Sequence, residues 1–242
     1  MIQQYGTVYG GFYLPKDMKL NKDSIVYCVG AGEDISLDIE ISDKYGCDVH
    51  TFDPTPRSIY HVNMIKDFFE GRIERPKSSK RYGGGDPKYI DMVLNRDKSI
   101  GSRIKFYDYG WHTFDGEVSF YRPSNPEFVS HTCSKEFAIA KHLNLKNSVT
   151  VNVKCLKTIM KELNHNKIDF LKLDIEGLEC DILNEMFHIL DNDKLPKYIC
   201  VDFDGRRANF EVKKYDLLME KFKNNGYVVL KNTNYDISFE RK

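Results

Sequence analysis

The stretch Ser24-Ile-Val-Tyr-Cys-Val-Gly-Ala-Gly-Glu-Asp-Ile-Ser36 contains the strongest indication of the fold. Ile25 to Val29 form a short apolar run rich in β-branched residues, which predicts a strand buried on both faces. Gly30 and Gly32 follow directly, and a G-x-G turn lets the backbone bend sharply and bring its amides close to a ligand. The stretch therefore predicts a strand that ends at a binding loop.

The residues after this turn indicate which kind of ligand the loop suits. Glu33 and Asp34 lie where a helix should begin, and their charges would repel a pyrophosphate. The third glycine of the dinucleotide fingerprint would fall at Ile35, so that fingerprint is incomplete. A ligand with an amino group and a ribose fits better, and S-adenosylmethionine (SAM) is such a ligand. For a lone G-x-G, an ordinary strand-to-helix turn is the alternative.

A second carboxylate supports a nucleotide-type site. Val49 to Asp53 predicts another strand, and this strand ends in an acid. In nucleotide-binding α/β sheets, an acid about 20 residues past the glycines accepts hydrogen bonds from the ribose hydroxyls. We therefore predict that Asp53 binds the ribose, with Pro54 beside it.

The composition predicts one domain of ordinary size in a reducing, cytoplasmic compartment. The 242 residues include 36 Lys and Arg against 36 Asp and Glu, so bulk charge gives no reason to expect a nucleic-acid partner. No basic segment followed by an apolar run opens the chain, and no stretch approaches the about 18 apolar residues of a membrane span. The 6 cysteines form no C-x-x-C pair, so we expect neither disulfides nor a zinc site.

Strand and helix patterns alternate along the chain and end in two strands with no helix between them. Residues 34–45 alternate apolar and polar side chains like a strand, but they join two parallel strands, so we predict a helix between the sheet and another layer. The closing strands must form an antiparallel hairpin, because a parallel pair needs a longer crossover. The order predicts an α/β fold with a doubly wound, mostly parallel seven-stranded sheet that closes with an antiparallel hairpin. Further strand patterns cover 103–107, 114–121, 148–153, 168–175, 198–203, 227–230 and 234–240, and helix patterns cover 56–68, 156–163, 178–190 and 215–222.

Two additions accompany this single domain of residues 1–242. Residues 1–22 form an aromatic and glycine-rich N-terminal arm, which we expect to pack on the domain, and Gly10 and Gly11 would let its backbone lie against a ligand. Residues 71–99 form a basic insertion loop. Such loops are usually solvated surface, but long ones are also often lids. The basic residues are Arg72, Arg75, Lys77, Lys80 and Arg81.

The closing hairpin resembles that of class I SAM-dependent methyltransferases, and three motifs resemble the FkbM family of such enzymes. The motifs are Val26–Ser36, Val49–Pro56 and Asp169-Phe-Leu-Lys-Leu-Asp-Ile-Glu-Gly-Leu-Glu179, of which the last is the most specific. Weaker agreement extends the likeness over roughly residues 9–240. Cys28 departs from the acidic or small residue that is common there in the wider family, and Asp204 departs from a frequent histidine.

The resemblance implies O-methylation of a hydroxyl on a sugar or another secondary metabolite, with SAM as the cofactor. Ligands of such sheets bind at the carboxyl ends of the strands, where the strand order reverses. At these ends, Tyr109, Gly110 and Trp111 would flank the adenine, although a buried core position is the alternative for Trp111. The predicted cofactor contacts are Gly30, Ala31, Gly32, Glu33, Asp34, Asp53, Pro54, Tyr109, Gly110, Trp111 and Asp174.

Two residues are candidates for removing the acceptor proton. His131 lies in a loop rich in Ser and Thr, and an imidazole titrates near neutral pH, although a lone loop histidine is often only a surface residue. Asp174 is the second candidate. Carboxylates on neighbouring strand ends also suit Mg²⁺, although such acids often only cap the next helix. The predicted acceptor contacts are His131, Thr132, Glu176, Asp202 and Asp204, and the possible Mg²⁺ ligands are Asp174, Asp202 and Asp204.

Two other functions are compatible with the pattern. An NAD-dependent or nucleotide-sugar oxidoreductase also uses a Rossmann-like sheet, but the missing third glycine and the closing hairpin count against it. A non-catalytic SAM-binding partner subunit is disfavoured by the intact glycine turn and acids. If the basic loop is a lid, it suggests a small-molecule or glycan acceptor that bears phosphate, such as a nucleotide-sugar. The sequence fixes neither the acceptor nor the oligomeric state.

Overall fold

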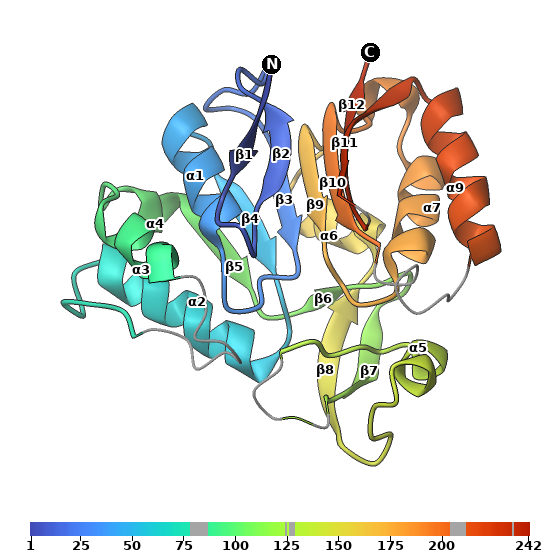
Figure 1. The fold of residues 1–242 in the computed structure, drawn as a ribbon, viewed down its shortest axis with the longest axis horizontal. Coiled ribbons are helices and arrows are strands. Elements are labelled where there is room, and N and C mark those ends of the chain that lie inside the picture. Colours follow the sequence, from blue (N-terminus) through green and yellow to red (C-terminus); the bar gives the residue numbers. More distant parts are fainter. Residues whose placement is uncertain (78–86, 124, 126–128, 204–211, 234) are drawn as a thin grey trace.

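The computed structural model describes residues 1–77, 87–123, 125, 129–203, 212–233 and 235–242. Its centre is a seven-stranded sheet with the strand order β11-β12-β10-β9-β3-β4-β5 (Figure 1). All neighbouring pairs from β10 to β5 are parallel, and β12 runs antiparallel to both β10 and β11. The predicted doubly wound sheet with a closing hairpin is therefore confirmed. The strands are β3 (Val26–Val29), β4 (Val49–Phe52), β5 (Ile104–Tyr107), β9 (Phe170–Leu173), β10 (Tyr198–Asp202), β11 (Tyr227–Thr233) and β12 (Asp236–Arg241).

Helices cover both faces of this sheet, because its central strands are apolar on both sides. In β3, Val26 and Cys28 belong to one buried cluster, and Tyr27 and Val29 belong to the other. The first cluster packs against α1 (Ser36–Tyr45), α2 (Pro56–Phe69), α3 (Pro87–Leu94) and α4 (Ile100–Arg103). The second packs against α6 (Leu156–Glu162), α7 (Glu179–Ile189) and α9 (Val212–Asn224), and a 3₁₀ turn, η1 (Asn192–Lys194), precedes β10.

The alternating segment after the glycine turn is a helix, as predicted. In α1 the buried residues include Leu37, Ile39 and Ile41, which point to different sides of the helix. One side lies on the sheet and the other lies under the N-terminal strands and α3 and α4. Burial on opposite sides explains why the sequence alternates like a strand although the backbone is helical.

The N-terminal arm is a two-stranded sheet, β1 (Ile2–Tyr5) and β2 (Phe12–Pro15), paired antiparallel. Tyr5 and Leu14 are fully buried in the same cluster as α1. The hairpin lies in front of the main sheet, beside β11 and β12 (Figure 1). Its connecting turn reaches toward the glycine loop that follows β3.

The insertion predicted as a loop over 71–99 is helical in part, because α3 lies within it. Arg72 forms an ion pair with Asp67 at 2.5 Å, and Arg96 forms one with Asp43 at 2.6 Å, so these basic residues are paired locally. Lys80 and Arg81 lie outside the described residues.

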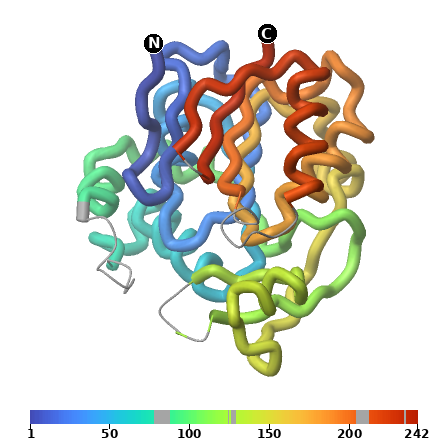
Figure 2. The backbone as a smooth tube through the Cα atoms, turned by 45° about the vertical axis from the view of Figure 1, so that its right-hand side comes forward, coloured from blue at the N-terminus to red at the C-terminus, as the bar shows by residue number. Residues whose placement is uncertain are grey.

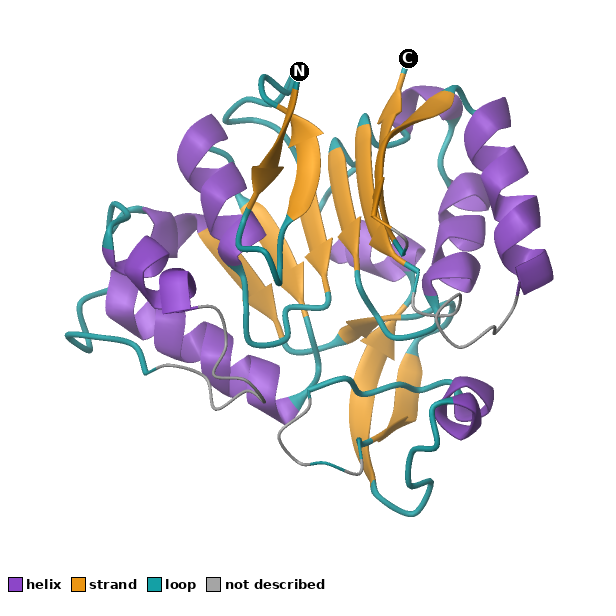
Figure 3. Ribbon diagram, viewed as in Figure 1, coloured by secondary structure: helices purple, strands orange, loops and turns teal. Residues whose placement is uncertain are grey.

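A smaller three-stranded sheet lies at the carboxyl ends of the main strands, below the main sheet in Figures 2 and 3. Its order is β6-β8-β7, with β6 (Gly110–Trp111), β7 (Gly116–Tyr121) and β8 (Ser148–Lys154). Helix α5 (Lys135–Ala140) follows β7 along the chain. Within the described part of the chain, no helix is long and apolar enough to cross a membrane.

Candidate active site

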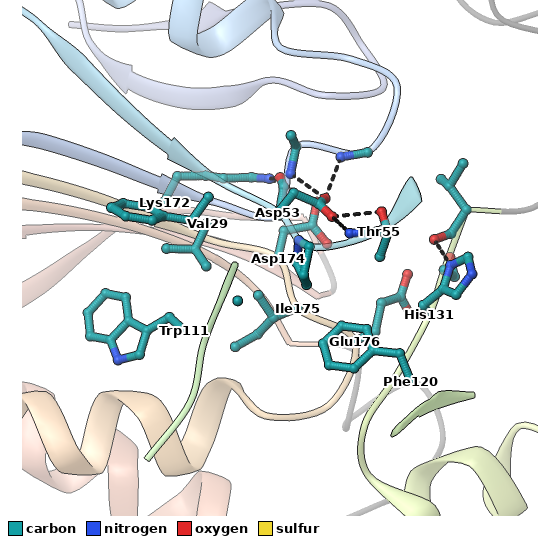
Figure 4. A pocket seen from close by; sticks show the side chains of 18 of the residues that line it. Val29, Asp53, Thr55, Trp111, Phe120, His131, Lys172, Asp174, Ile175 and Glu176 are labelled. Carbon is teal, nitrogen blue, oxygen red and sulfur yellow. Dashed lines mark hydrogen bonds and ion pairs between the residues drawn. The ribbon is translucent and has the colours of Figure 1, made fainter. Parts of the chain in front are cut away.

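A pocket lies at the carboxyl ends of β3, β4 and β9, facing the three-stranded sheet (Figure 4). Its open space, counted out to the solvent, is about 790 Å³. Trp111 and His131 lie on opposite sides of it (Figure 4). The predicted site residues that line it are Gly30, Ala31, Gly32, Asp34, Asp53, Pro54, Gly110, Trp111, His131, Asp174 and Glu176.

Two predicted cofactor contacts lie outside this lining. Glu33 is buried in an ion pair with Arg57, whose Nη2 lies 2.7 Å from Glu33 Oε2. Tyr109 packs against Phe52 and Tyr107, with ring centroids 5.8 and 5.7 Å away. Tyr109 therefore packs behind Phe52, which lines the pocket, and Glu33 is engaged by Arg57.

Two predicted acceptor contacts also lie outside the lining. Thr132 is buried, and its hydroxyl oxygen accepts a hydrogen bond from the Ser134 amide at 3.1 Å. Asp202 is the last residue of β10 and lies opposite Asp236 of β12. Asp204 lies outside the described residues.

The glycine turn after β3 is packed against the end of β9. Gly30 has a φ of +86°, and its amide donates to the Phe52 carbonyl at 2.9 Å. A Cβ atom at Gly30 would overlap the Asp174 carbonyl oxygen. At Gly32, φ is +52°, but the nearest atom to a Cβ would be Val129 Cγ2 at 3.8 Å. The first glycine is therefore required by close packing, whereas a Cβ at the second would make only an ordinary van der Waals contact.

Asp53 holds the glycine loop through both of its oxygens. Oδ2 accepts from the amides of Ala31 at 2.9 Å and Gly32 at 3.0 Å. Oδ1 accepts from the amide and hydroxyl of Thr55 at 2.8 and 2.7 Å, so this hydroxyl braces Asp53 instead of capping α2. A carboxylate has about four acceptor positions, and these donors use them. A ribose hydroxyl would have to replace one of the donors.

The N-terminal arm holds the other acid of the loop and adds residues to the pocket. The Thr7 hydroxyl donates to Asp34 Oδ2 at 2.7 Å, and the Thr7 amide donates to Ser36 Oγ at 2.8 Å. Tyr9 and Gly10 of the same turn line the pocket. Gly10 lies so close to Asp34 that a Cβ atom would stand 2.7 Å from its Cγ.

The turn after β9 presents Glu176 to the pocket through a strained backbone. Glu176 has a φ of +57° and Gly177 a φ of +106°. Residues other than glycine rarely adopt a positive φ. Glu179 stabilises this turn, because its Oε1 accepts from the amides of Ile175 at 3.2 Å and Gly177 at 3.0 Å. Strain of this kind often occurs at functional sites.

Lys172 is a charged residue of the pocket that the sequence analysis did not select. It is buried in β9, its Nζ donates to the Gly30 carbonyl, and it forms an ion pair with Asp174 at 3.2 Å. Burial opposes its charge, but Asp174 and Asp38 outweigh burial and raise the pKa of Lys172 above its usual value. A lysine inside a strand that is otherwise apolar was the available signal.

His131 is oriented by its own loop. Its Nδ1 lies 2.8 Å from the Val129 carbonyl oxygen, which can only accept, so Nδ1 carries the hydrogen. In the neutral ring, Nε2 then has a free lone pair. Burial lowers the pKa of His131 below its usual value, with Arg122 and Arg57 adding to the effect. The ring is therefore neutral at physiological pH.

Other lining residues escaped the sequence analysis because their positions depend on tertiary structure. Phe120 ends an alternating strand, and Ser130 precedes His131, so both lay within recognised patterns. Apart from Lys172, nothing in the local sequence distinguished the remainder. The missed residues with side chains of interest are Tyr9, Thr55, Phe120, Ser130, Lys172, Ile175 and Leu178.

Of the three possible Mg²⁺ ligands, Asp174 and Asp202 lie within the described residues. Asp174 lines the pocket and Asp202 does not. Across the residues that the structure describes, no three or more His, Cys, Asp or Glu side chains form a group that fits a metal ion. The geometry therefore gives no support for Mg²⁺.

Comparison with known proteins gives a family match. The sequence matches the methyltransferase FkbM domain over residues 25–229, which is most of the chain. A search of curated proteins found no significant match.

Solved structures with similar folds share little sequence with this chain. The methyltransferase FkbM from Methylobacillus flagellatus is 14% identical, with a TM-score of 0.49, and the match covers 92% of this chain and 44% of that one. This chain thus spans less than half the length of that protein. The fibrillarin pre-rRNA processing protein from Methanococcus jannaschii is 12% identical, with a TM-score of 0.41 and coverages of 94% and 71%. Precorrin-6y C5,15-methyltransferase from Geobacter metallireducens is 11% identical, with a TM-score of 0.41 and coverages of 93% and 83%.

Proposed function

The chain belongs to the FkbM methyltransferase family, and we propose that it is a SAM-dependent O-methyltransferase with His131 as the general base. The acceptor is a hydroxyl of a sugar, a nucleotide-sugar, a glycan or a related small metabolite. One observation supports this most strongly: an oriented, neutral histidine shares a pocket with the glycine turn that follows β3. The family match favours methyl transfer over the oxidoreductase alternative.

The lining suits a ligand that carries positive charge. Asp34, Asp53, Asp174 and Glu176 line the pocket, and Lys172 is the basic side chain among the lining residues. SAM carries an ammonium and a sulfonium, and when bound it supplies an activated methyl group. Gly32 lines the pocket and has no side chain, so its backbone admits a ligand close to the chain. The residues present therefore fit the cofactor that the family implies.

His131 is the better of the two predicted bases. Asp174 is already engaged in an ion pair with buried Lys172 at 3.2 Å. His131 is neutral, and its Nδ1 is already donating to a carbonyl, so its Nε2 is free to accept the proton of an acceptor hydroxyl. The carbonyl of Val129 then stabilises the charged ring that results.

The cofactor assignment is tested by calorimetry with S-adenosylhomocysteine (SAH) and with NAD⁺. We expect SAH to bind and to raise the melting temperature, because binding to the folded state alone stabilises it. NAD⁺ should do neither. A melting shift with NAD⁺ and none with SAH would restore the oxidoreductase alternative.

The base is tested with His131→Ala, with the exposed His188→Ala of α7 as a matched control. Transfer of labelled methyl from SAM is measured on free sugars, nucleotide-sugars and glycans. His131→Ala should lower kcat by roughly 10²–10⁴-fold and leave SAH affinity unchanged. SAH binding by the wild type without transfer to any acceptor would instead favour a non-catalytic SAM-binding subunit.

The pH dependence of kcat/KM gives an independent readout of the same group. Since burial lowers the pKa of His131, the ring stays neutral until the pH falls below its ordinary value of 6.5. Activity should therefore hold at neutral pH and fall on the acidic side of 6.5. Loss of this acidic limb in His131→Ala, but not in His188→Ala, identifies the group. An acidic limb that persists in His131→Ala would assign it to another residue.

A further inference from the structure

The end of β7 lies directly beside the loop that carries His131. Tyr121 and Thr132 form an antiparallel bridge. The Tyr121 amide donates to the Thr132 carbonyl at 2.7 Å, and the Thr132 amide donates to the Tyr121 carbonyl at 3.2 Å. In antiparallel pairing, the residue after one partner lies opposite the residue before the other. Arg122 is therefore opposite His131, and their side chains leave the backbone on the same side.

That side is the side of the pocket. Side chains alternate along a strand, so Phe120 and Arg122 project to the same face of β7. Phe120 and His131 both line the pocket. Arg122 is not itself part of the lining, but it lies on the same face of the strand as Phe120 and opposite His131, both of which line the pocket.

The Arg122 guanidinium is partly buried and has no partner in the part of the chain that the structure describes. Its Nε is buried without a hydrogen bond, and no described residue accepts one from its other nitrogens. An arginine presents five donors in a rigid fork that matches a carboxylate or a phosphate. Its buried Nε is unpaired, which is costly unless a ligand brings an acceptor to it.

A second arginine beside the pocket provides a contrast. Arg57 also lies near His131, but its fork is occupied, since its Nε and Nη2 donate to the two oxygens of Glu33 at 3.1 and 2.7 Å. Among the described residues, no acid pairs with Arg122 in this way. Of the two guanidiniums, only that of Arg122 presents an open fork.

We propose that Arg122 binds an oxyanion of the acceptor, a phosphate or a carboxylate, next to the hydroxyl that His131 deprotonates. The inference rests on the proposed function and narrows its acceptor to anionic compounds such as sugar phosphates, nucleotide-sugars or uronates. A bidentate contact would fix the acceptor in orientation as well as in place. The basic insertion is not required for this, because none of its described residues lines the pocket.

The effect of Arg122 on the pKa of His131 can be measured without the true acceptor. Arg122 is one of the groups that lower the pKa of His131, after burial. An oxyanion bound to Arg122 would offset this charge and raise the pKa of His131. Removing the charge by Arg122→Gln should raise the same pKa without any ligand.

The experiment is an NMR titration of the His131 ring in four proteins: the wild type, Arg122→Gln, Arg122→Lys and the control Arg75→Gln. Arg75 is exposed, and its only described ion partner is Asp91 at 4.0 Å, so the control removes the same charge far from the pocket. The probes are inorganic phosphate, glucuronate and glucose, each with and without SAH. SAH affinity is measured in all four proteins.

Phosphate, glucuronate or both should raise the pKa of His131 in the wild type and in Arg75→Gln, and glucose should not. Arg122→Gln should weaken the binding of the active anion by roughly 10–100-fold. Arg122→Lys keeps the charge without the fork, so it should recover binding only in part. If Arg122→Gln does not fold, the Arg122→Lys variant provides the comparison. A response to phosphate alone identifies a phosphorylated acceptor, and one to glucuronate alone identifies a carboxylate.

Two outcomes overturn the proposal. In the first, neither anion shifts the pKa of His131 in the wild type. In the second, the active anion binds Arg122→Gln as tightly as it binds the wild type. The SAH measurements separate this failure from failure of the proposed function. Intact SAH binding without an anion effect rejects only the role of Arg122. Absent SAH binding rejects the methyltransferase assignment of the pocket itself.

Discussion

The two walls of the pocket use their polar groups in different ways. The sheet wall consists of the glycine turn, Asp34, Asp53 and the end of β9, and its carboxylates accept hydrogen bonds from the chain itself. The outer wall consists of Phe120 and residues 129–131. There, the structure gives His131 one hydrogen bond, to its own loop, and gives Ser130 none among the described residues.

The sheet wall is therefore preformed, whereas the outer wall has polar groups that a ligand can still bond. Buried polar groups that are already bonded hold the backbone in one conformation, so binding there costs little reorganisation. Polar groups without partners gain the most when a ligand supplies them. The sheet wall therefore suits a cofactor that every reaction cycle uses, and the outer wall suits the acceptor. Substitutions in the sheet wall should affect folding and cofactor affinity together, whereas those in the outer wall should affect only acceptor use.

The largest effect is expected for Gly30→Ala. Its Cβ would overlap the Asp174 carbonyl, and φ is +86°, so strain and overpacking together should lower the free energy of unfolding by about 2–5 kcal/mol. Gly32→Ala is the matched control, because it has the strain but not the overlap, and it should cost about 1–2 kcal/mol. Urea denaturation measures both. Equal losses in the two variants would show that the tight packing of the turn on β9 is not important.

Asp53→Asn should have the next largest effect. The asparagine amide keeps the shape of the carboxylate but loses its charge. One acceptor oxygen becomes an NH₂ donor, which then faces backbone amides that are also donors. We expect a loss of about 1.5–3 kcal/mol in unfolding free energy and a parallel loss of SAH affinity. Asp23→Asn, at an exposed position, is the control. Weaker SAH binding at unchanged stability would mean that Asp53 acts on the ribose directly and not through the loop.

Thr7→Val tests whether the N-terminal arm belongs to the sheet wall. The change removes the hydroxyl that donates to buried Asp34 and accepts from the Gly10 amide, at 2.7 and 3.0 Å. The expected loss is about 1–2 kcal/mol in unfolding free energy, with weaker SAH binding because Tyr9 and Gly10 lose their anchor. Thr7→Ser keeps the hydroxyl and should restore both values. If Thr7→Val binds SAH as the wild type does, the arm only packs on the domain.

The features that depend on local sequence patterns could be predicted from the sequence. Apolar runs, glycines and the lack of a helix before the last strand were enough to predict the sheet, and the need for a parallel crossover identified α1 correctly. Residues 26–36 also indicated where the pocket would lie. What escaped were contacts between distant segments: Thr7 on Asp34, Lys172 on Gly30, and Thr55 on Asp53. Thr7 and Thr55 looked ordinary in their own segments, and although Lys172 stood out in an apolar strand, its partner could not be read from that strand, because each role depends on which segments become neighbours.

The smallest effect is expected for Ser130→Ala, and it is the sharpest test of the outer wall. Ser130 lines the pocket, and the structure gives it no hydrogen bond within the described residues. Since nothing in the fold depends on its hydroxyl, the change should alter the unfolding free energy by less than about 0.5 kcal/mol and leave SAH affinity unchanged. Urea denaturation and calorimetry measure the two values. A loss of unfolding free energy comparable to that of Thr7→Val would mean that the fold depends on the Ser130 hydroxyl. The outer wall would then be stabilised internally like the sheet wall, and the proposed difference between the two walls would be wrong. If the result is neutral, any rise in acceptor KM in this variant reflects contact with the acceptor alone.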